Sequence, residues 1–148
     1  YNRPATAFVA SFIGDMNFIY GHLLSANDSK STIEVEGHAI NAQKSKPGMK
    51  KDAEALVCIR TERVQINPHL TVDNTVQADL RRIVYRGTDY EVTCQIGESE
   101  IRAVVSAVIW DQALKVGDMV KIGWNAQDVI FFPREEEQEI IQYSVEAV

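Results

Sequence analysis

The chain has 148 residues and a formal net charge of −6, because 21 aspartate and glutamate residues outnumber 15 lysine and arginine residues. This length suits one domain or two small subdomains, and 45% hydrophobic residues with 24% charged residues exclude a disordered chain. The acidic balance argues against a protein that binds the phosphate backbone of a nucleic acid, since such proteins carry a basic surface. We therefore expect an acidic globular protein with no nucleic-acid partner.

The opening segment, residues 1–15, predicts a short helix. Pro4 suits the first turn of a helix, where its missing N–H costs little. Phe8, Phe12 and Ile13 fall on one helical face, and Gly14 suits the residue that follows a helix. We interpret residues 1–15 as a linker and a helical remnant of a preceding domain in a longer chain.

From residue 16 onward the hydrophobic pattern alternates, which predicts strands. Gly21 indicates a bulge or bend, and a change of parity indicates a second bulge near Arg81 and Arg82. About ten short strands separated by Gly, Asp and Asn turns are typical of a small barrel or sandwich. The clearest expected strands are 17–24, 32–36, 38–42, 55–60, 76–85, 90–96, 101–110, 119–124 and 129–132.

These strands predict a mainly all-β fold, with OB-fold-like small barrels of short antiparallel strands after the N-terminal helix. We expect residues 16–148 to form this part, as two intertwined subdomains (about 16–70 and 71–133) and a C-terminal tail. The tail carries an acidic run, and residues 140–145 are apolar enough to add a strand or a docking segment.

The sequence carries no catalytic motif that we could identify. None of the eight glycines is followed by lysine, which excludes a Walker A loop, and there is neither a GxGxxG nor a GxSxG motif. Three histidines, His22, His38 and His69, lie far apart without metal-ligand spacing. Cys58 and Cys94 lie in apolar strands and are predicted to be buried, inert thiols. We expect no catalytic residue, metal or cofactor in this chain.

Three surface features leave alternatives open. The basic loop Lys44–Lys51 could contact nucleic acid or lipid headgroups, but its Pro47-Gly48 pair favours a solvated loop. Glu34 and Glu36 could form a pair of catalytic carboxylates, although alternating glutamates usually mark the solvent face of a strand. The aromatic residues of the second half could stack on bases, but the acidic charge favours a core and an interface. They are Tyr85, Tyr90, Trp110, Trp124, Phe131 and Phe132.

Four segments, taken together and in order, resemble one family. They are YNRPATAFVASFIGDMN (1–17), ALVCIRTERVQI (55–66), IVYRGTDYEVTCQI (83–96) and VGDMVKIGWNAQDVIFF (116–132). The first is similar to the segment that closes the nucleotide-binding domain of ABC importers. The other three resemble their C-terminal regulatory domain, of the transport-associated OB-fold type. The spermidine/putrescine branch is the most similar. Thr61 departs from the pattern, which has proline at this position.

The resemblance implies a non-catalytic regulatory and dimerisation domain of an importer's ATP-binding subunit. It implies a homodimer, membrane permease subunits as partners, room for a small-molecule effector, and ATP with Mg²⁺ in a preceding domain. It also implies a cytoplasmic location at the inner face of the cell membrane. The candidate structural or interface residues are Arg60 and Glu62 as a charge pair, Gly87 and Gly117 in turns, and Asp118 as a hydrogen-bonding turn residue.

Two other functions remain open. One is an independent OB-fold module that binds nucleic acid, supported by the aromatic residues with Arg81 and Arg82 but opposed by the charge. The other, a domain that binds a small anion or a metal oxyanion, is implied by resemblance to the accessory domains of molybdate-type importers.

Overall fold

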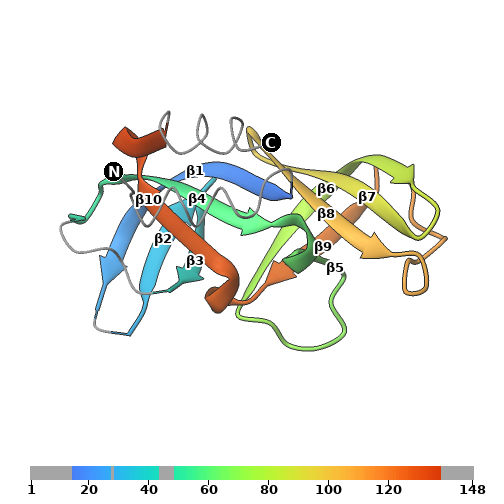
Figure 1. Ribbon diagram of the computed structural model, residues 1–148, viewed down its shortest axis with the longest axis horizontal. Coiled ribbons are helices and arrows are strands. Elements are labelled where there is room, and N and C mark those ends of the chain that lie inside the picture. The colour runs from blue at the N-terminus through green and yellow to red at the C-terminus, as the bar shows by residue number, and fades with distance from the viewer. Residues whose placement is uncertain (1–14, 28, 44–48, 138–148) are drawn as a thin grey trace, which may run out of the picture.

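The computed structural model describes residues 15–27, 29–43 and 49–137 (Figure 1). The expected N-terminal helix (1–14), most of the C-terminal tail (138–148) and the centre of the lysine loop (44–48) lie outside these residues. In the part of the chain that is described, no helix is both long and apolar enough to span a membrane.

The described residues form two antiparallel five-stranded sheets that lie side by side (Figure 1). The strand order is β10-β4-β1-β2-β3 in the first sheet and β5-β9-β6-β7-β8 in the second. The all-β class is confirmed. The strands are β1 (Met16–Ala26), β2 (Ser31–Val35), β3 (His38–Ala42), β4 (Glu54–Arg60), β5 (Gln65–Ile66), β6 (Asn74–Tyr85), β7 (Asp89–Ile96), β8 (Ser99–Ser106), β9 (Met119–Trp124) and β10 (Val129–Pro133). The 3-10 helices are η1 (Thr61–Arg63), η2 (Ala126–Asp128) and η3 (Arg134–Glu136).

The two sheets share one connectivity. β1 to β4 build the first sheet, and the chain then crosses through η1 to place β5 in the second. β6 to β9 build the second sheet, and the chain crosses back through η2 to place β10 in the first. Arg63 of η1 lies 3.8 Å from Asp128 of η2, so the two crossing points are also joined by an ion pair. A division into separate subdomains near residue 70 stays a prediction.

The main core lies on the inward faces of both sheets and is continuous between them. It arises because successive side chains of a strand point to opposite faces, so every second residue faces inward. β2 shows the pattern clearly, since Ser31, Ile33 and Val35 are buried and their neighbours are partly exposed. A smaller cluster on the other face of the first sheet contains Met16, Leu56, Cys58 and Phe132.

Three sequence expectations need correction. The strand expected at 101–110 ends at Ser106, whose carbonyl accepts hydrogen bonds from the N–H groups of Ile109 and Trp110 and so turns the chain. The expected strand 32–36 ends one residue early, and Glu36 has a φ of 49° in the turn, so Glu34 and Glu36 do not share a strand face. The two-residue strand β5 was not expected.

Of the two expected bulges, one lies where the sequence predicts it and the other does not. The register of β6 shifts between Leu80 and Arg82, which confirms the bulge expected there. The shift in β1 lies between Leu23 and Ser25 instead of at Gly21. Gly21 is needed for a close approach, because a Cβ atom there would lie 2.5 Å from the main-chain oxygen of Glu34 on β2.

Candidate functional site

A pocket of about 550 Å³ opens between the segment that follows β4 and the end of β8. Its apolar lining includes Val64 and Trp110, which are buried, and Ile109, which is 74% exposed at the surface. The described residues that line it are Glu62, Val64, Gln65, Ile66, Asn67, Pro68, His69, Val104, Val105, Ser106, Ile109, Trp110, Asp111 and Leu114.

The first wall, residues 62–69, is held by main-chain hydrogen bonds to neighbouring elements. Asn67 adopts a φ of 48°, its N–H donates to the carbonyl of Lys121 at 2.6 Å, and its Oδ1 accepts the Lys121 N–H at 2.9 Å. Asparagine tolerates this left-handed conformation better than most residues. These two hydrogen bonds between Asn67 and Lys121 of β9 hold the first wall in place just after β5.

The second wall is the turn from Ser106 to Leu114. Asp111 closes it, since its Oδ1 accepts the N–H of Ala113 at 2.9 Å and its carbonyl accepts the N–H of Leu114 at 3.1 Å. This is a local side-chain turn of the kind that aspartate favours. The turn places Trp110 and Asp111 at the pocket and leaves Val108 91% exposed.

The ring of Trp110 packs against that of Tyr90. The two rings lie 5.1 Å apart with an interplanar angle of 24°, and Tyr90 lies 5.0 Å from Tyr85. Gln112 Nε2 donates to the Tyr90 hydroxyl at 2.9 Å. Aromatic pairs at these separations attract beyond their buried area. The stack therefore runs from the exposed Tyr85 to the pocket wall.

Of the predicted pair Arg60 and Glu62, Glu62 lines this pocket, and Arg60 contacts Glu62. Arg60 Nη2 is 2.5 Å from Glu62 Oε1. Thr61 between them is buried, and its N–H donates to the carbonyl of Asp15 at 2.8 Å. A proline cannot make that bond. The departure from the family pattern thus ties η1 to the start of β1.

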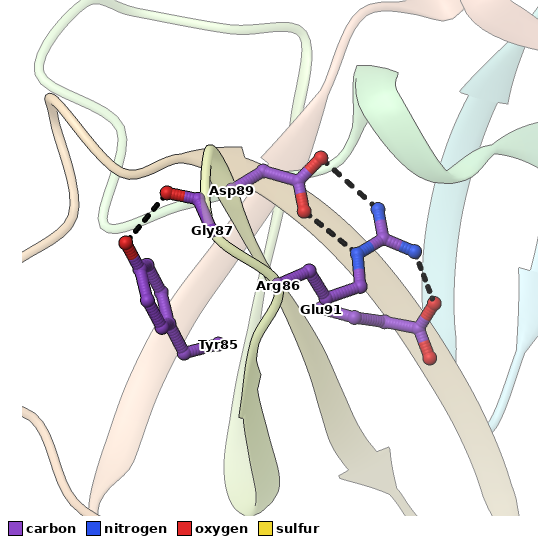
Figure 2. Close-up of polar contacts among 5 residues, drawn as sticks. All are labelled: Tyr85, Arg86, Gly87, Asp89 and Glu91. Carbon is purple, nitrogen blue, oxygen red and sulfur yellow. Dashed lines mark hydrogen bonds and ion pairs between the residues drawn. The ribbon is translucent and has the colours of Figure 1, made fainter.

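Gly87 lies in the turn between β6 and β7 (Figure 2). It is not among the residues that line the pocket. Its φ is 98°, a conformation that favours glycine, and its carbonyl accepts the Tyr85 hydroxyl at 2.5 Å. In the same turn Arg86 donates to Asp89 at 2.7 and 3.0 Å and to Glu91 at 3.3 Å. The hydrogen bond from Arg86 lowers the pKa of the Asp89 carboxyl.

Gly117 and Asp118 shape the turn before β9 and also lie outside the pocket lining. Gly117 has a φ of 99°, and its N–H donates to the carbonyl of Leu80 at 2.8 Å. Asp118 Oδ2 accepts the N–H of Lys115 at 3.0 Å. The structure therefore brings Glu62 to the pocket, pairs Arg60 with Glu62, and places the other three predicted residues in turns.

The thiols have the character expected of inert groups. Both cysteines are free and buried. Burial raises the pKa of Cys94 from 9.0 to about 11, and it also raises the pKa of Cys58. Within residues 15–27, 29–43 and 49–137, no group of three or more His, Cys, Asp or Glu residues could hold a metal ion.

Comparison with known proteins identifies one family. The model of the TOBE domain matches residues 57–132, more than half of the 148-residue chain. The chain is 30% identical over 145 residues to the spermidine/putrescine import ATP-binding protein PotA of Protochlamydia amoebophila, covering 90% of this chain and 38% of the relative. It is 29% identical over 107 residues to the Fe(3+) ions import ATP-binding protein FbpC of Escherichia coli O157:H7, covering 72% of this chain and 28% of the relative. The chain therefore spans less than two fifths of these relatives.

Among solved structures, the fold is similar to that of ModG, described as a cytoplasmic molybdate-binding protein. The TM-score is 0.66 at 16% identity, and the match covers 80% of this chain and 96% of ModG. At this identity the likeness concerns the fold.

Proposed function

Because the chain belongs to the TOBE domain family, we propose that it is the non-catalytic regulatory and dimerisation domain of the ATP-binding subunit of an ABC-type importer. One observation carries the proposal. The chain is similar over nine tenths of its length to an import ATP-binding protein, and the TOBE match lies inside that region.

The described residues support a role without chemistry of their own. The cysteines are buried thiols with raised pKa values, and the charged pair at the pocket is an arginine with a glutamate. A domain of this kind influences an attached ATPase by holding two subunits together or by binding an effector that prefers one state of the motor. Two sheets joined by a continuous core provide the rigid body that such coupling needs.

The proposed partners follow from the proposed subunit. They are a second copy of the chain, and membrane permease subunits reached through an attached ATPase domain that holds ATP and Mg²⁺. The proposed location is the cytoplasmic face of the membrane. For the transported solute we propose a polyamine, on the similarity to PotA, while the similarity to FbpC sets iron as the alternative to be tested.

The test measures ATP hydrolysis and sedimentation of this chain beside the full subunit. We expect hydrolysis by the full subunit, none above the buffer rate by this chain, and dimers of the chain that increase with concentration. Hydrolysis by this chain alone would overturn the non-catalytic role. A chain that stays monomeric while the full subunit dimerises would overturn the dimerisation role.

A second candidate function is the binding of a small oxyanion, which the fold likeness to ModG favours. A bound ligand raises thermal stability by mass action. A rise in the unfolding temperature with molybdate or sulfate, but not with chloride at equal ionic strength, would support this candidate. No shift with any oxyanion would exclude it.

A further inference from the structure

We propose that the pocket between residues 62–69 and 104–114 binds a small organic cation with an apolar or aromatic body. The inference goes beyond the proposed function and does not depend on it, because binding to this chain can be measured without an ATPase domain.

The size and lining of the pocket suit a small molecule. Its volume of about 550 Å³ lies within the range of small-molecule sites, which are mainly apolar with a few placed polar groups. Val64, Ile66, Trp110 and Leu114 supply apolar surface from both walls. A ligand with a hydrocarbon or aromatic body would remove that surface from water.

The charged groups of the pocket lining favour a ligand with positive charge. Among the described residues that line the pocket, two carry carboxyl groups, Glu62 and Asp111, one is a histidine, His69, and none is lysine or arginine. Arg60 pairs with Glu62 and offsets part of its charge. Asp111 uses one oxygen for the turn, and a carboxylate has acceptor capacity beyond one hydrogen bond. An ammonium group is therefore favoured over a carboxylate or a phosphate.

Trp110 adds a second reason for a cation. The indole ring is the best cation–π partner among side chains, and the interaction strengthens as water is excluded. Trp110 is only 8% exposed, and the stack with Tyr90 holds its ring in place. A rigid ring costs little conformational entropy when a ligand binds.

The test compares three probes that share one ring and differ in charge: benzylammonium, benzyl alcohol and benzoate. We expect benzylammonium to bind about tenfold more tightly than benzyl alcohol, with benzoate weakest, in titration calorimetry at neutral pH. Equal affinities, tighter binding of benzoate, or no binding of any probe at millimolar concentration would overturn the inference.

Variants locate the site. Asp111→Asn keeps the turn hydrogen bond, so we expect it to weaken benzylammonium about five- to tenfold and to leave benzyl alcohol unchanged. Glu34→Gln, on β2 in the first sheet, is the matched control and should change neither affinity. If Asp111→Asn leaves the benzylammonium affinity unchanged, the cation does not bind here and the inference is wrong.

Fluorescence gives an independent readout. The chain has two tryptophans, and Trp124 is fully buried while Trp110 lines the pocket. We expect benzylammonium to change the emission of the unsubstituted chain and of Trp124→Phe, but not that of Trp110→Phe. If benzylammonium changes the emission of Trp110→Phe as much as that of the unsubstituted chain, the assignment of the site is wrong. Failure of these probes would leave the hydrolysis and sedimentation results of the proposed function untouched.

Discussion

The side chain of Asn17 on β1 bonds to both main-chain groups of Arg102 on β8. Its Nδ2 donates to the Arg102 carbonyl at 2.8 Å, and its Oδ1 accepts the Arg102 N–H at 2.8 Å. The amide thus replaces a neighbouring strand and joins the first sheet to the second. Asn17 is only 4% exposed, so water cannot easily replace these bonds.

Asn74 on β6 makes the same exchange in the opposite direction. Its Oδ1 accepts the N–H of Asn41 on β3 at 2.7 Å, and its Nδ2 donates to the carbonyl of Asn41 at 2.9 Å. In each case the central strand of one sheet holds the edge strand β3 or β8 of the other. The side chains of Asn17 and Asn74 therefore join the two sheets in equivalent ways, and we call each of them a clasp.

Replacing either clasp should destabilise the fold strongly. For Asn17→Ala and Asn74→Ala we expect a loss of about 2–4 kcal/mol in the free energy of unfolding, because each leaves two main-chain groups without partners. Urea unfolding followed by circular dichroism measures this loss. Gln77→Ala, an exposed position on β6, is the control and should change it by less than about 0.5 kcal/mol. Equal effects at the three positions would show that the clasps carry no special stability.

Alternation predicted most of the strands, and two of them with their observed bounds, 38–42 and 119–124. It failed where the apolar run continued past the point at which the chain turns. Val108, Ile109 and Trp110 prolong the pattern of β8, but the carbonyl of Ser106 accepts two N–H groups and ends the strand. Nothing in the local sequence distinguishes these residues from a strand.

The candidate site was predictable only in part. The resemblance pointed to Glu62, which lines the pocket, but Trp110 was interpreted as core or interface and Asp111 was not considered. Both meet residues 62–69 because β8, the strand before them, contacts η1 and the two-residue strand β5. A two-residue strand carries too short a pattern to be recognised, so the meeting of these distant segments was not foreseen. Asn17 is only the last residue of the segment 1–17 that carries the resemblance, since a side chain that replaces a strand has no sequence pattern.

Gly21 should tolerate no side chain. In Gly21→Ala the new Cβ would lie 2.5 Å from the Glu34 carbonyl oxygen and 2.9 Å from methyl groups of Ile33 and Val35. Since main-chain atoms cannot move aside easily, we expect a loss of about 2–4 kcal/mol in the free energy of unfolding, measured in urea.

Gly37 provides the matched control for Gly21. Its Cβ would meet nothing within 4 Å, but its φ is 82°. Gly37→Ala should therefore cost only the backbone strain, about 1–2 kcal/mol. A larger loss for Gly37→Ala than for Gly21→Ala would contradict the close approach of β1 and β2.

The aromatic stack should determine how well Trp110 is shielded. Tyr90→Ala removes the ring that lies 5.1 Å from Trp110 and also the hydroxyl that accepts from Gln112. We expect acrylamide to quench the fluorescence of Trp110 more strongly in this variant. Tyr90→Phe keeps the ring and should stay close to the unsubstituted chain. Measuring in a Trp124→Phe background assigns the signal, and equal quenching in both Tyr90 variants would show that the ring does not shield Trp110.

Raising the pH should destabilise the fold through the buried thiols. The pKa of Cys94 is about 11 in the folded chain and 9.0 in its ordinary state, so between these values the unfolded chain releases a proton that the folded chain keeps. The free energy of unfolding therefore falls as the pH rises, by up to about 3 kcal/mol across this interval for a shift of about 2 units. Below pH 9.0 the contribution of Cys94 is present almost in full. Cys58 contributes in the same direction, because burial raises its pKa as well.

Urea unfolding at neutral pH and at about pH 10 measures this dependence. Cys94→Ala should reduce the pH dependence without abolishing it, because the substitution removes one buried thiol and leaves that of Cys58. Val92→Ala, on the same buried face of β7, is the matched control, since it also removes apolar volume but keeps the thiol. We expect the pH dependence of Val92→Ala to equal that of the unsubstituted chain. If Cys94→Ala and Val92→Ala show the same dependence, deprotonation of Cys94 is not what weakens the fold in alkali.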